Sequence, residues 1–196
     1  MIDITPIIAA VITALATVAS VLLGQKFISK KQKSCVVRET SQNANVYTAL
    51  QYIMEQMKAD RGYVLEFHNG EIYFSGRGQQ KFSCTYEIVE EGISPESFNS
   101  QNHRVSNYHN YINEIVTNGY YFYPNVESIN DQAFYQMISR KGIKSIYNVP
   151  IKTLDGKIIG ILGVDYVKNE IPAEGHTEDT LNFMRRQART IAGYLI

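Results

Sequence analysis

Residues 146–167 read IYNVPIKTLDGKIIGILGVDYV, and this stretch decides the fold. Two apolar runs, each rich in isoleucine or valine, flank the pair Asp155-Gly156. An aspartate-glycine pair between two such runs is typical of the tight turn of a β-hairpin. The stretch therefore predicts two antiparallel strands joined at that pair.

The strands of this hairpin are expected at residues 145–151 and 157–167. Gly160 and Gly163 lie inside the second strand, where a missing side chain indicates a bulge or the close approach of a crossing helix. Helical periodicity follows at residues 177–195, whose apolar face carries Leu181, Met184, Ala188, Ile191 and Leu195.

Towards the amino end, the spacing of apolar residues predicts the other elements of a mixed α/β domain. Helices are expected at 34–59, 109–117 and 131–141, and strands at 61–67, 80–89 and 120–123. Local composition predicts a turn at 68–70, the start of a short helix at 94–96 and a helix cap at Asn130.

The hairpin at 146–167 resembles the closing hairpin of GAF-type sensory domains, in which a strand with a proline step turns through an Asp-Gly pair. The run RGYVLEF at 61–67 agrees with a strand of that family. By element order the resemblance covers residues 39–196. It implies the α+β fold shared by GAF and PAS domains, an antiparallel sheet with helices on one face and a pocket on the other.

The resemblance also implies where a ligand would lie, between the sheet and the helical middle segment. Small-ligand pockets combine aromatic walls with a few polar tips. The residues of this kind at the implied place are Phe67, His68, Asn69, Cys84, Tyr86, Tyr121 and Tyr123. An alternative stays open, in which the aromatic residues fill the core and the domain dimerises or binds a regulatory protein.

The amino-terminal segment predicts a single transmembrane helix. Residues 4–23 read ITPIIAAVITALATVASVLL and contain no charged side chain, and a helix of this length spans about 30 Å, the thickness of a bilayer core. The anchor runs from Ile4 to Leu23, and one of its faces carries the small residues Ala9, Thr13, Ala16 and Ser20. Such a face predicts self-association into a homo-oligomer.

The charges that flank this anchor predict its orientation. Five basic residues lie between Lys26 and Arg38, whereas Asp3 is the charged residue on the amino side. The positive-inside rule then places the chain in the inner (cytoplasmic) membrane with its carboxy-terminal domain in the cytoplasm. The expected organisation is an anchor at 1–25, a basic juxtamembrane segment and connecting helix at 26–59, and a GAF-like domain at 60–196.

Charge and motif content exclude several classes of function. Five of the 19 basic and one of the 19 acidic residues precede Glu39, which leaves 14 and 18, a net charge of −4 that argues against nucleic-acid binding. No phosphate-binding or nucleophile motif occurs, and no metal-ligand spacing involves the histidines, His68, His103, His109 and His176. The sequence therefore predicts a non-enzymatic protein without cofactor or metal.

Two functions agree with these observations. The first is a membrane-anchored sensory or interaction module that binds a small ligand or a partner. The second follows from a resemblance to T-even bacteriophage holins, which carry one amino-terminal transmembrane helix before a compact α/β domain and end in a helix like RRQARTIAGYLI at 185–196. In that case the anchor would oligomerise and permeabilise the membrane, leading to host cell lysis, under control of the soluble domain.

Overall fold

The computed structural model describes residues 5–196, apart from the side chains of residues 5–12, 23–35, 37–38 and 173. Packing divides the chain into two compact units, Met1–Asn43 and Ala44–Ile196. Helix α1 (Thr5–Met57) supplies the described part of the first unit and the first element of the second. The second unit therefore begins inside this helix, whereas the sequence placed the start of the domain at residue 60.

Among the helices formed by described residues, none is long and apolar enough to cross a membrane. The predicted anchor extends past those residues: Ile4 and the side chains of Ala9 and Leu23 lie outside the part of the chain that the structure describes. Thr13, Ala16 and Ser20 are described and exposed, and the Ser20 hydroxyl donates to the Ala16 carbonyl at 2.8 Å. The anchor and its small-residue face stay predictions.

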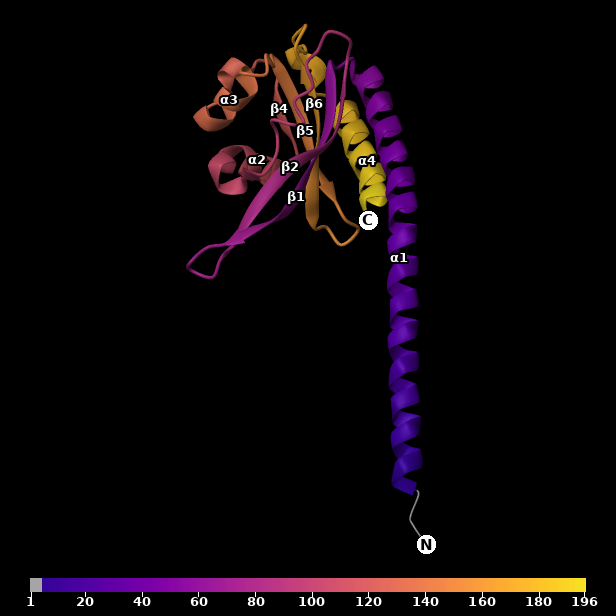
Figure 1. Ribbon diagram of the computed structural model, residues 1–196. Helices are drawn as coiled ribbons and strands as arrows, with labels where there is room; N and C mark the ends of the chain where they lie inside the picture. Colours follow the sequence, from indigo (N-terminus) through magenta and orange to yellow (C-terminus); the bar gives the residue numbers. More distant parts are fainter. Residues whose placement is uncertain (1–4) are drawn as a thin grey trace. The chain divides into compact units, whose positions relative to one another are not determined.

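The second unit is built on one sheet of six strands in the order β3-β2-β1-β6-β5-β4 (Figure 1). β1 (Arg61–Ile72) lies between β2 (Gly78–Val89) and β6 (Ile158–Tyr166). The outer strands are β3 (His103–Arg104), β5 (Ser145–Lys152) and β4 (Tyr121–Tyr123). Every neighbouring pair is antiparallel, which confirms the predicted α+β class.

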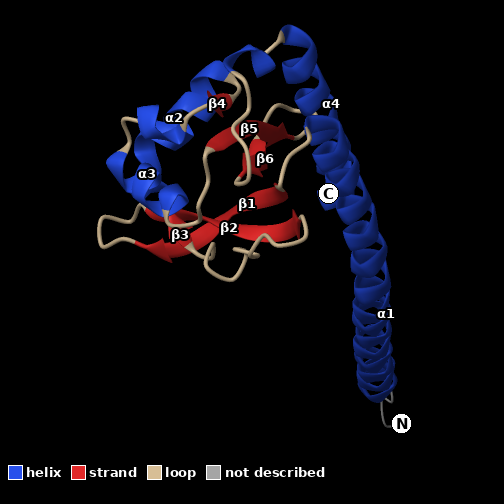
Figure 2. Cartoon of the chain, turned by 90° about the horizontal axis from the view of Figure 1, so that it is seen from above, coloured by secondary structure: helices blue, strands red, loops and turns tan. Residues whose placement is uncertain are grey.

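Helices cover both faces of this sheet (Figure 2). α4 (Glu178–Leu195) and the last turns of α1 pack on one face, whereas α2 (His109–Asn118) and α3 (Gln132–Ser139) pack on the other. Short 3-10 turns lie between these elements at Val105–Tyr108, Val126–Ser128 and Ala173–Gly175. The helical middle segment, α2 and α3, therefore covers the face on which the sequence placed the pocket.

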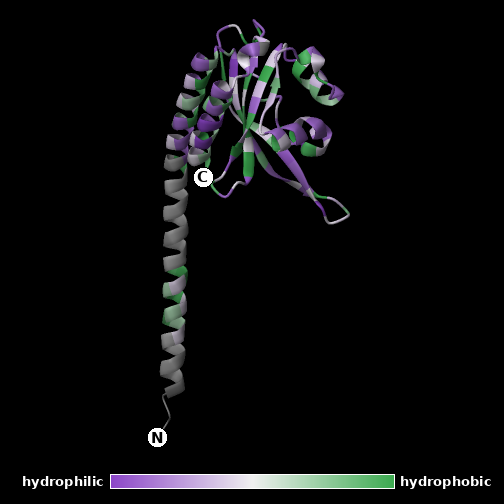
Figure 3. Ribbon diagram, turned by 180° about the vertical axis from the view of Figure 1, so that it is seen from behind, coloured by the Kyte–Doolittle hydropathy of each residue, from purple (hydrophilic) through white to green (hydrophobic). Residues whose placement is uncertain are grey.

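The core between the sheet, α1 and α4 is mostly aliphatic. Val46, Leu50 and Ile53 recur at helical spacing on α1 and are fully buried. They join the apolar face of α4 that the sequence predicted, while the outward surface of α4 is largely hydrophilic (Figure 3). Burial of each such side chain contributes about 1.5–3 kcal/mol, so this layer holds the end of α1 on the sheet.

The core on the other face is aromatic. Tyr111 of α2 stacks on Phe134 of α3 with ring centroids 3.9 Å apart. Tyr121 of β4 meets both rings edge-on, at 4.8 and 5.4 Å. Offset and edge-on contacts between rings add to the burial energy, so this cluster fixes α2 and α3 against each other above the sheet.

The hairpin of β1 and β2 is longer than the sequence predicted. The turn expected at 68–70 is wrong, because β1 continues to Ile72 and stays paired with β2. Gly70 instead allows the neighbouring strand to come close, since a Cβ at this position would lie 2.9 Å from the carbonyl oxygen of Gln79. The chain turns around Gly76, whose φ of +80° favours glycine.

Two smaller expectations are also wrong. No helix starts at 94–96, and the backbone N–H groups of Glu96 and Ser97 instead donate to the carboxylate of Glu87 at 2.8–2.9 Å. The cap of α3 is Asp131 rather than Asn130, because the Asp131 carboxylate accepts a hydrogen bond from the N–H of Phe134 at 3.1 Å. Both changes place an acidic side chain on free backbone N–H groups.

The predicted closing hairpin is confirmed. β5 and β6 are antiparallel partners, and the turn between them contains Gly156 with φ +85°. Gly160 and Gly163 do mark close approaches, but the neighbours belong to β1 and β5 rather than to a crossing helix. At Gly163 a Cβ would overlap the side chains of Tyr63 and Asn148, so the absent side chain leaves room for these two groups to meet.

Candidate functional site

Three neighbouring strands bring buried charges together on the face covered by α2 and α3. Arg61 opens β1, Asp165 lies opposite it on β6, and Glu87 comes from β2. The Arg61 guanidinium lies 3.1 Å from Asp165 Oδ2 and 3.3 Å from Glu87 Oε1, and it donates to the Ser94 carbonyl at 3.0 Å. The three charged side chains are at most 5% exposed, so each charge depends on its partner rather than on water.

Asp165 connects this cluster to neutral polar groups. The Tyr63 hydroxyl lies 3.1 Å from Asp165 Oδ1 and 2.9 Å from Asn148 Oδ1, with one proton to donate. Asn148 donates from Nδ2 to the Tyr111 hydroxyl at 2.7 Å. A connected network therefore crosses from β6 through β1 and β5 to α2.

Burial sets the protonation of this network. It raises the pKa of Asp165 to about 6, against the opposing effect of the Arg61 and Lys141 cations. Burial also raises the pKa of Tyr63 and Tyr111 above the ordinary value of a phenol. Both tyrosines are therefore neutral hydrogen-bonding groups.

A small cavity lies against the network. It offers about 30 Å³ to water-sized groups, which is room for about two water molecules. Its lining combines the charged cluster with apolar walls and includes Arg61, Tyr63, Glu87, Asp165, Leu65, Phe82, Cys84, Tyr111, Phe134 and Ile146. Pockets for drug-sized ligands measure about 300–1,000 Å³, so the cavity by itself admits only a small group.

A larger groove of about 510 Å³ adjoins the cavity at the surface. It lies between the loop that precedes β3 and helix α3, with Asn99 on one side and Ala133 and Gln136 on the other. The residues that line both spaces are Glu96, His103, Met137 and Lys141. Groove and cavity together form one candidate site, wide at the surface and charged at its inner end.

Two polar side chains mark the junction of groove and cavity. Lys141 donates from Nζ to Ser100 Oγ at 2.5 Å. His103 packs against Phe82, and its Nε2 is buried without a hydrogen-bond partner in the described part of the chain. Burial and the Lys141 charge lower the pKa of His103, while the backbone of Asn99 acts weakly the other way. The ring is therefore neutral and free to bond a ligand.

Four of the seven predicted pocket residues lie in this aromatic layer. Cys84 lines the cavity, and burial raises the pKa of its thiol to about 12, so it is an unreactive wall. Phe67, Tyr121 and Tyr123 pack in the surrounding cluster without lining the cavity. The Tyr123 hydroxyl donates to Glu114 at 3.3 Å.

His68 and Asn69 lie away from the cavity, further along β1. His68 Nε2 is 2.9 Å from Ser83 Oγ, and Asn69 is exposed. Their position follows from the long hairpin, because β1 carries them past the strands that surround the network.

Tyr86 lies on the opposite face of the sheet. Its ring meets that of Tyr47 on α1, with centroids 5.6 Å apart. The register of β1 and β2 shifts by one residue between Tyr86 and Cys84, which marks a β-bulge. Since a shift of one residue reverses the facing of a side chain, the bulge separates two residues that sequence alternation places together.

Sequence reasoning missed the charged part of the site, namely Arg61, Glu87, Asn148, Lys141 and Asp165. A signal was present for two of them, since Arg61 and Asp165 stand at the ends of otherwise apolar strand patterns. A buried charge requires a partner, so such positions indicate an ion pair.

The arrangement fits binding better than catalysis. The described thiol is neutral, and the tyrosines of the network are ordinary hydrogen-bonding phenols. Among residues with described side chains, no group of three or more histidine, cysteine or carboxylate residues can hold a metal ion. The site offers hydrogen bonds and charge inside an aromatic enclosure.

A comparison with protein families agrees with this architecture. The model of the GAF domain matches residues 43–195. The chain belongs to the GAF domain family. GAF domains are typically non-catalytic regulatory or sensory domains, and the match begins within one residue of the packed unit that starts at Ala44.

Solved structures show the same fold at low sequence identity. The GAF domain of PixJ from Thermosynechococcus elongatus in its blue-light absorbing form is 15% identical, with a TM-score of 0.62 and coverage of 81% of this chain and 86% of that one. A GAF region from a Geobacter sulfurreducens protein described as a membrane protein is 16% identical, with a TM-score of 0.57 and coverage of 83% and 97%.

A domain from a Sinorhizobium meliloti 1021 protein described as a two-component sensor histidine kinase is 15% identical, with a TM-score of 0.51 and coverage of 76% and 87%. A search of curated proteins gave no match. None of these findings supports the resemblance to T-even holins.

Proposed function

We propose that this GAF domain is a sensory module that binds a small ligand in the groove and cavity between the sheet and α3. The observation that carries the proposal is the buried charged network at the inner end of a solvent-accessible groove. Buried charges are costly to maintain, and perturbed protonation at the base of a concave site is a feature of functional sites.

The dimensions and polar groups favour a particular kind of ligand. The groove has room for a body of metabolite size, whereas the cavity has room only for a small polar head. At the junction, Lys141 supplies a cation and His103 a neutral ring nitrogen. A flat or aromatic molecule with one acidic or carbonyl group facing Lys141 satisfies both requirements.

The sheet offers a route from this site to the helices on its other face. Tyr63 contacts the network, whereas the next residue, Val64, packs in the core with α1 and α4. On β6, Asp165 belongs to the network, and the following Tyr166 donates from its hydroxyl to the Met57 carbonyl at the end of α1. A ligand that shifts β1 or β6 therefore acts directly on the end of α1.

Ligand binding is tested by blocking the groove from α3. The full-length wild-type chain is first screened against aromatic acids, nucleotides and amino acids for compounds that raise its melting temperature. Ala133→Trp is expected to abolish the stabilisation by these compounds. Gln132→Trp is the matched control, because Gln132 is exposed on the same helix but does not line the groove. Lys141→Met is expected to weaken binding about tenfold, since it removes a charged hydrogen bond. Equal stabilisation of wild type and Ala133→Trp would contradict the proposed site.

We also propose that the chain is tethered to the inner membrane through residues 4–23, with the GAF domain in the cytoplasm. The uncharged run and the basic residues that follow it support this arrangement. The similar GAF region from the Geobacter sulfurreducens protein described as a membrane protein gives a precedent. Self-association through the small-residue face of the anchor belongs to the same proposal.

The tether is tested by thiol labelling in intact and permeabilised cells. Cys84 is buried, so Cys35→Ser serves as the background for a new exposed cysteine at Ser75. Ser75→Cys is expected to react with an impermeant maleimide only after permeabilisation, and the chain is expected to stay with membranes in alkaline carbonate. Labelling of intact cells would contradict the orientation, and release by carbonate would contradict the tether.

A further inference from the structure

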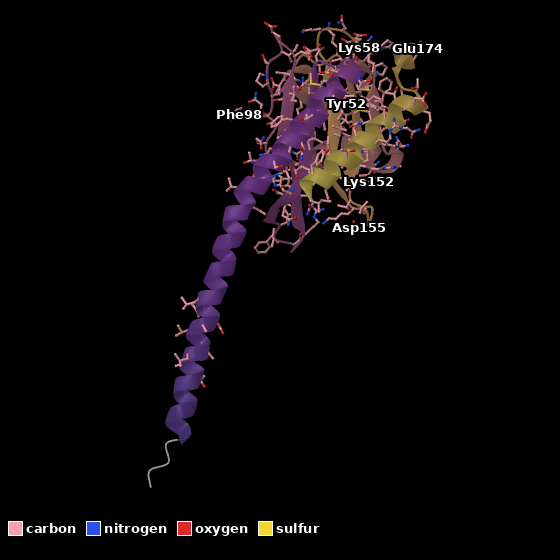
Figure 4. All side chains as sticks on the ribbon, turned by 90° about the vertical axis from the view of Figure 1, so that its right-hand side faces the viewer. Tyr52, Lys58, Phe98, Lys152, Asp155 and Glu174 are labelled. Atoms are coloured by element: carbon pink, nitrogen blue, oxygen red, sulfur yellow. The ribbon has the colours of Figure 1, made fainter. Side chains whose placement is uncertain are left out.

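A third concavity of about 250 Å³ lies apart from the ligand site described above. It is lined by Arg185 and Arg189 of α4, by Pro150 and Lys152 at the end of β5, and by Gly119 after α2. Figure 4 shows Lys152 beside the yellow ribbon of α4. We call this concavity the basic niche, because its lining holds three cationic side chains and no acidic one.

No carboxylate among the described side chains pairs with the cations of the basic niche. Both ion pairs found among the described residues belong to Arg61, so none involves Lys152, Arg185 or Arg189. The side chains of these three residues also form no hydrogen bond with another described residue. Glu178 accepts from Asn182 and Asp155 accepts from Thr153, and neither carboxylate forms an ion pair with a niche cation. Three unpaired cations around one hollow are unusual in a domain whose net charge is negative.

The fold explains how the cations come together. Arg185 and Arg189 are four residues apart, so they project from the same face of α4. β4 pairs with β5 only as far as Asn148, which leaves the end of β5 with Lys152 free on that edge. Gly119 ends α2 with φ +74°, and a Cβ there would lie 3.2 Å from Arg185 Nη2, so glycine leaves space for the guanidinium.

We propose that the basic niche binds a phosphoryl group. A guanidinium presents a planar fork of donors that matches two phosphate oxygens, and two such forks with one ammonium can balance a multiply charged anion. Without an anion the three cations repel one another, so binding also relieves that repulsion. The niche uses none of the residues that line the groove or the cavity, so it is independent of the sensory site.

The test is isothermal titration of the full-length chain in a neutral detergent with inorganic pyrophosphate as the probe. Arg185→Gln with Arg189→Gln is expected to weaken binding at least tenfold, and Lys152→Gln to weaken it severalfold. Arg186→Gln is the matched control, because it removes the same charge from the neighbouring position of α4, which does not line the niche. It is expected to leave the dissociation constant unchanged.

Stability separates a binding role from a structural one. Without pyrophosphate, the double variant is expected to unfold at a temperature no lower than wild type, because repulsion is removed. With pyrophosphate, wild type and Arg186→Gln are expected to gain stability and the double variant is not. A double variant that is less stable without the probe and gains as much from it as wild type would overturn the proposal.

A second arm identifies the source of the phosphoryl group, with a soluble short-chain phosphatidylglycerol in place of pyrophosphate. Binding of either probe that depends on Arg185 and Arg189 but not on Arg186 supports the proposed phosphoryl site. Tighter binding of the lipid indicates a lipid headgroup as the natural ligand, and tighter binding of pyrophosphate indicates a free phosphate. Absence of binding in both arms at millimolar probe, or equal weakening by Arg186→Gln, overturns it.

Discussion

Replacement of Arg61 by glutamine is expected to lower the free energy of unfolding by about 3–5 kcal/mol, the range for breaking a buried ion pair from one side. The guanidinium lies within 3.1–3.3 Å of the carboxylates of Asp165 and Glu87. Glutamine keeps a polar head but removes the charge, so the two buried carboxylates lose the cation that contacts both of them. Arg61 also donates to the Ser94 carbonyl, so the loop before β3 is expected to loosen.

The measurement is urea unfolding of the full-length chain followed by far-ultraviolet circular dichroism. Arg77→Gln is the matched control, because Arg77 is exposed at the tip of the same hairpin, and such surface changes stay within about 0.5 kcal/mol. Combining Arg61→Gln with Asp165→Asn is expected to recover part of the loss, since it removes one uncompensated charge. Equal midpoints for Arg61→Gln and Arg77→Gln would show that the buried pairs contribute nothing.

The second large effect is the dependence of stability on pH that Asp165 imposes. Burial raises the pKa of Asp165 in the folded chain to about 6, from an ordinary value of 3.8. Between these values the folded state holds a proton that the unfolded state has released, so stability falls as pH rises through this window. The difference of about two pKa units corresponds to about 3 kcal/mol lost between pH 4 and pH 7.

Asp165→Asn is expected to remove this component, so its unfolding free energy should fall less steeply than that of wild type between pH 4 and 6. Asp155→Asn is the control, because hydrogen bonding from Thr153 lowers the pKa of that exposed carboxyl. Its contribution is lost only as pH falls below the window, so its slope between pH 4 and 6 should equal that of wild type. Parallel curves for wild type and Asp165→Asn would mean that Asp165 has an ordinary pKa.

The protonation of Asp165 also affects the binding of the proposed ligand. A polar group of the ligand that enters the cavity contacts Asp165, which is neutral at the low end of this pH window and charged at the high end. The affinity of the ligand is therefore expected to change across the window. An acidic head is expected to bind more tightly below pH 6, where protonation of Asp165 removes a negative charge from the cavity wall.

The predictable part of the fold came from local patterns. The Asp155-Gly156 turn and the stripe of α4 each depend on residues close together in sequence, so composition and spacing were sufficient. The turn expected at 68–70 failed for the same reason, because local composition cannot tell a glycine that forms a turn from one that admits a neighbouring strand. Gly70 is of the second kind.

The candidate site was less predictable because its residues come from all parts of the domain. Of the seven pocket residues predicted from the sequence, Cys84 alone lines the cavity, and three others lie in the same aromatic layer. Tyr86 faces the other way because of a one-residue bulge that no period-two pattern reveals. The polar part, centred on Arg61 and Asp165, depends on partners 104 residues apart.

The sequence by itself determined the α+β class and the hairpin that closes the sheet, because apolar periodicity and turn composition specify strands and helices locally. The tertiary structure alone decided which charges meet. Register placed Arg61 opposite Asp165, the absent side chain of Gly163 let Tyr63 reach Asn148, and α2 and α3 covered this face of the sheet. Burial then converted ordinary polar residues into a coupled network whose protonation differs from that of the same residues in water.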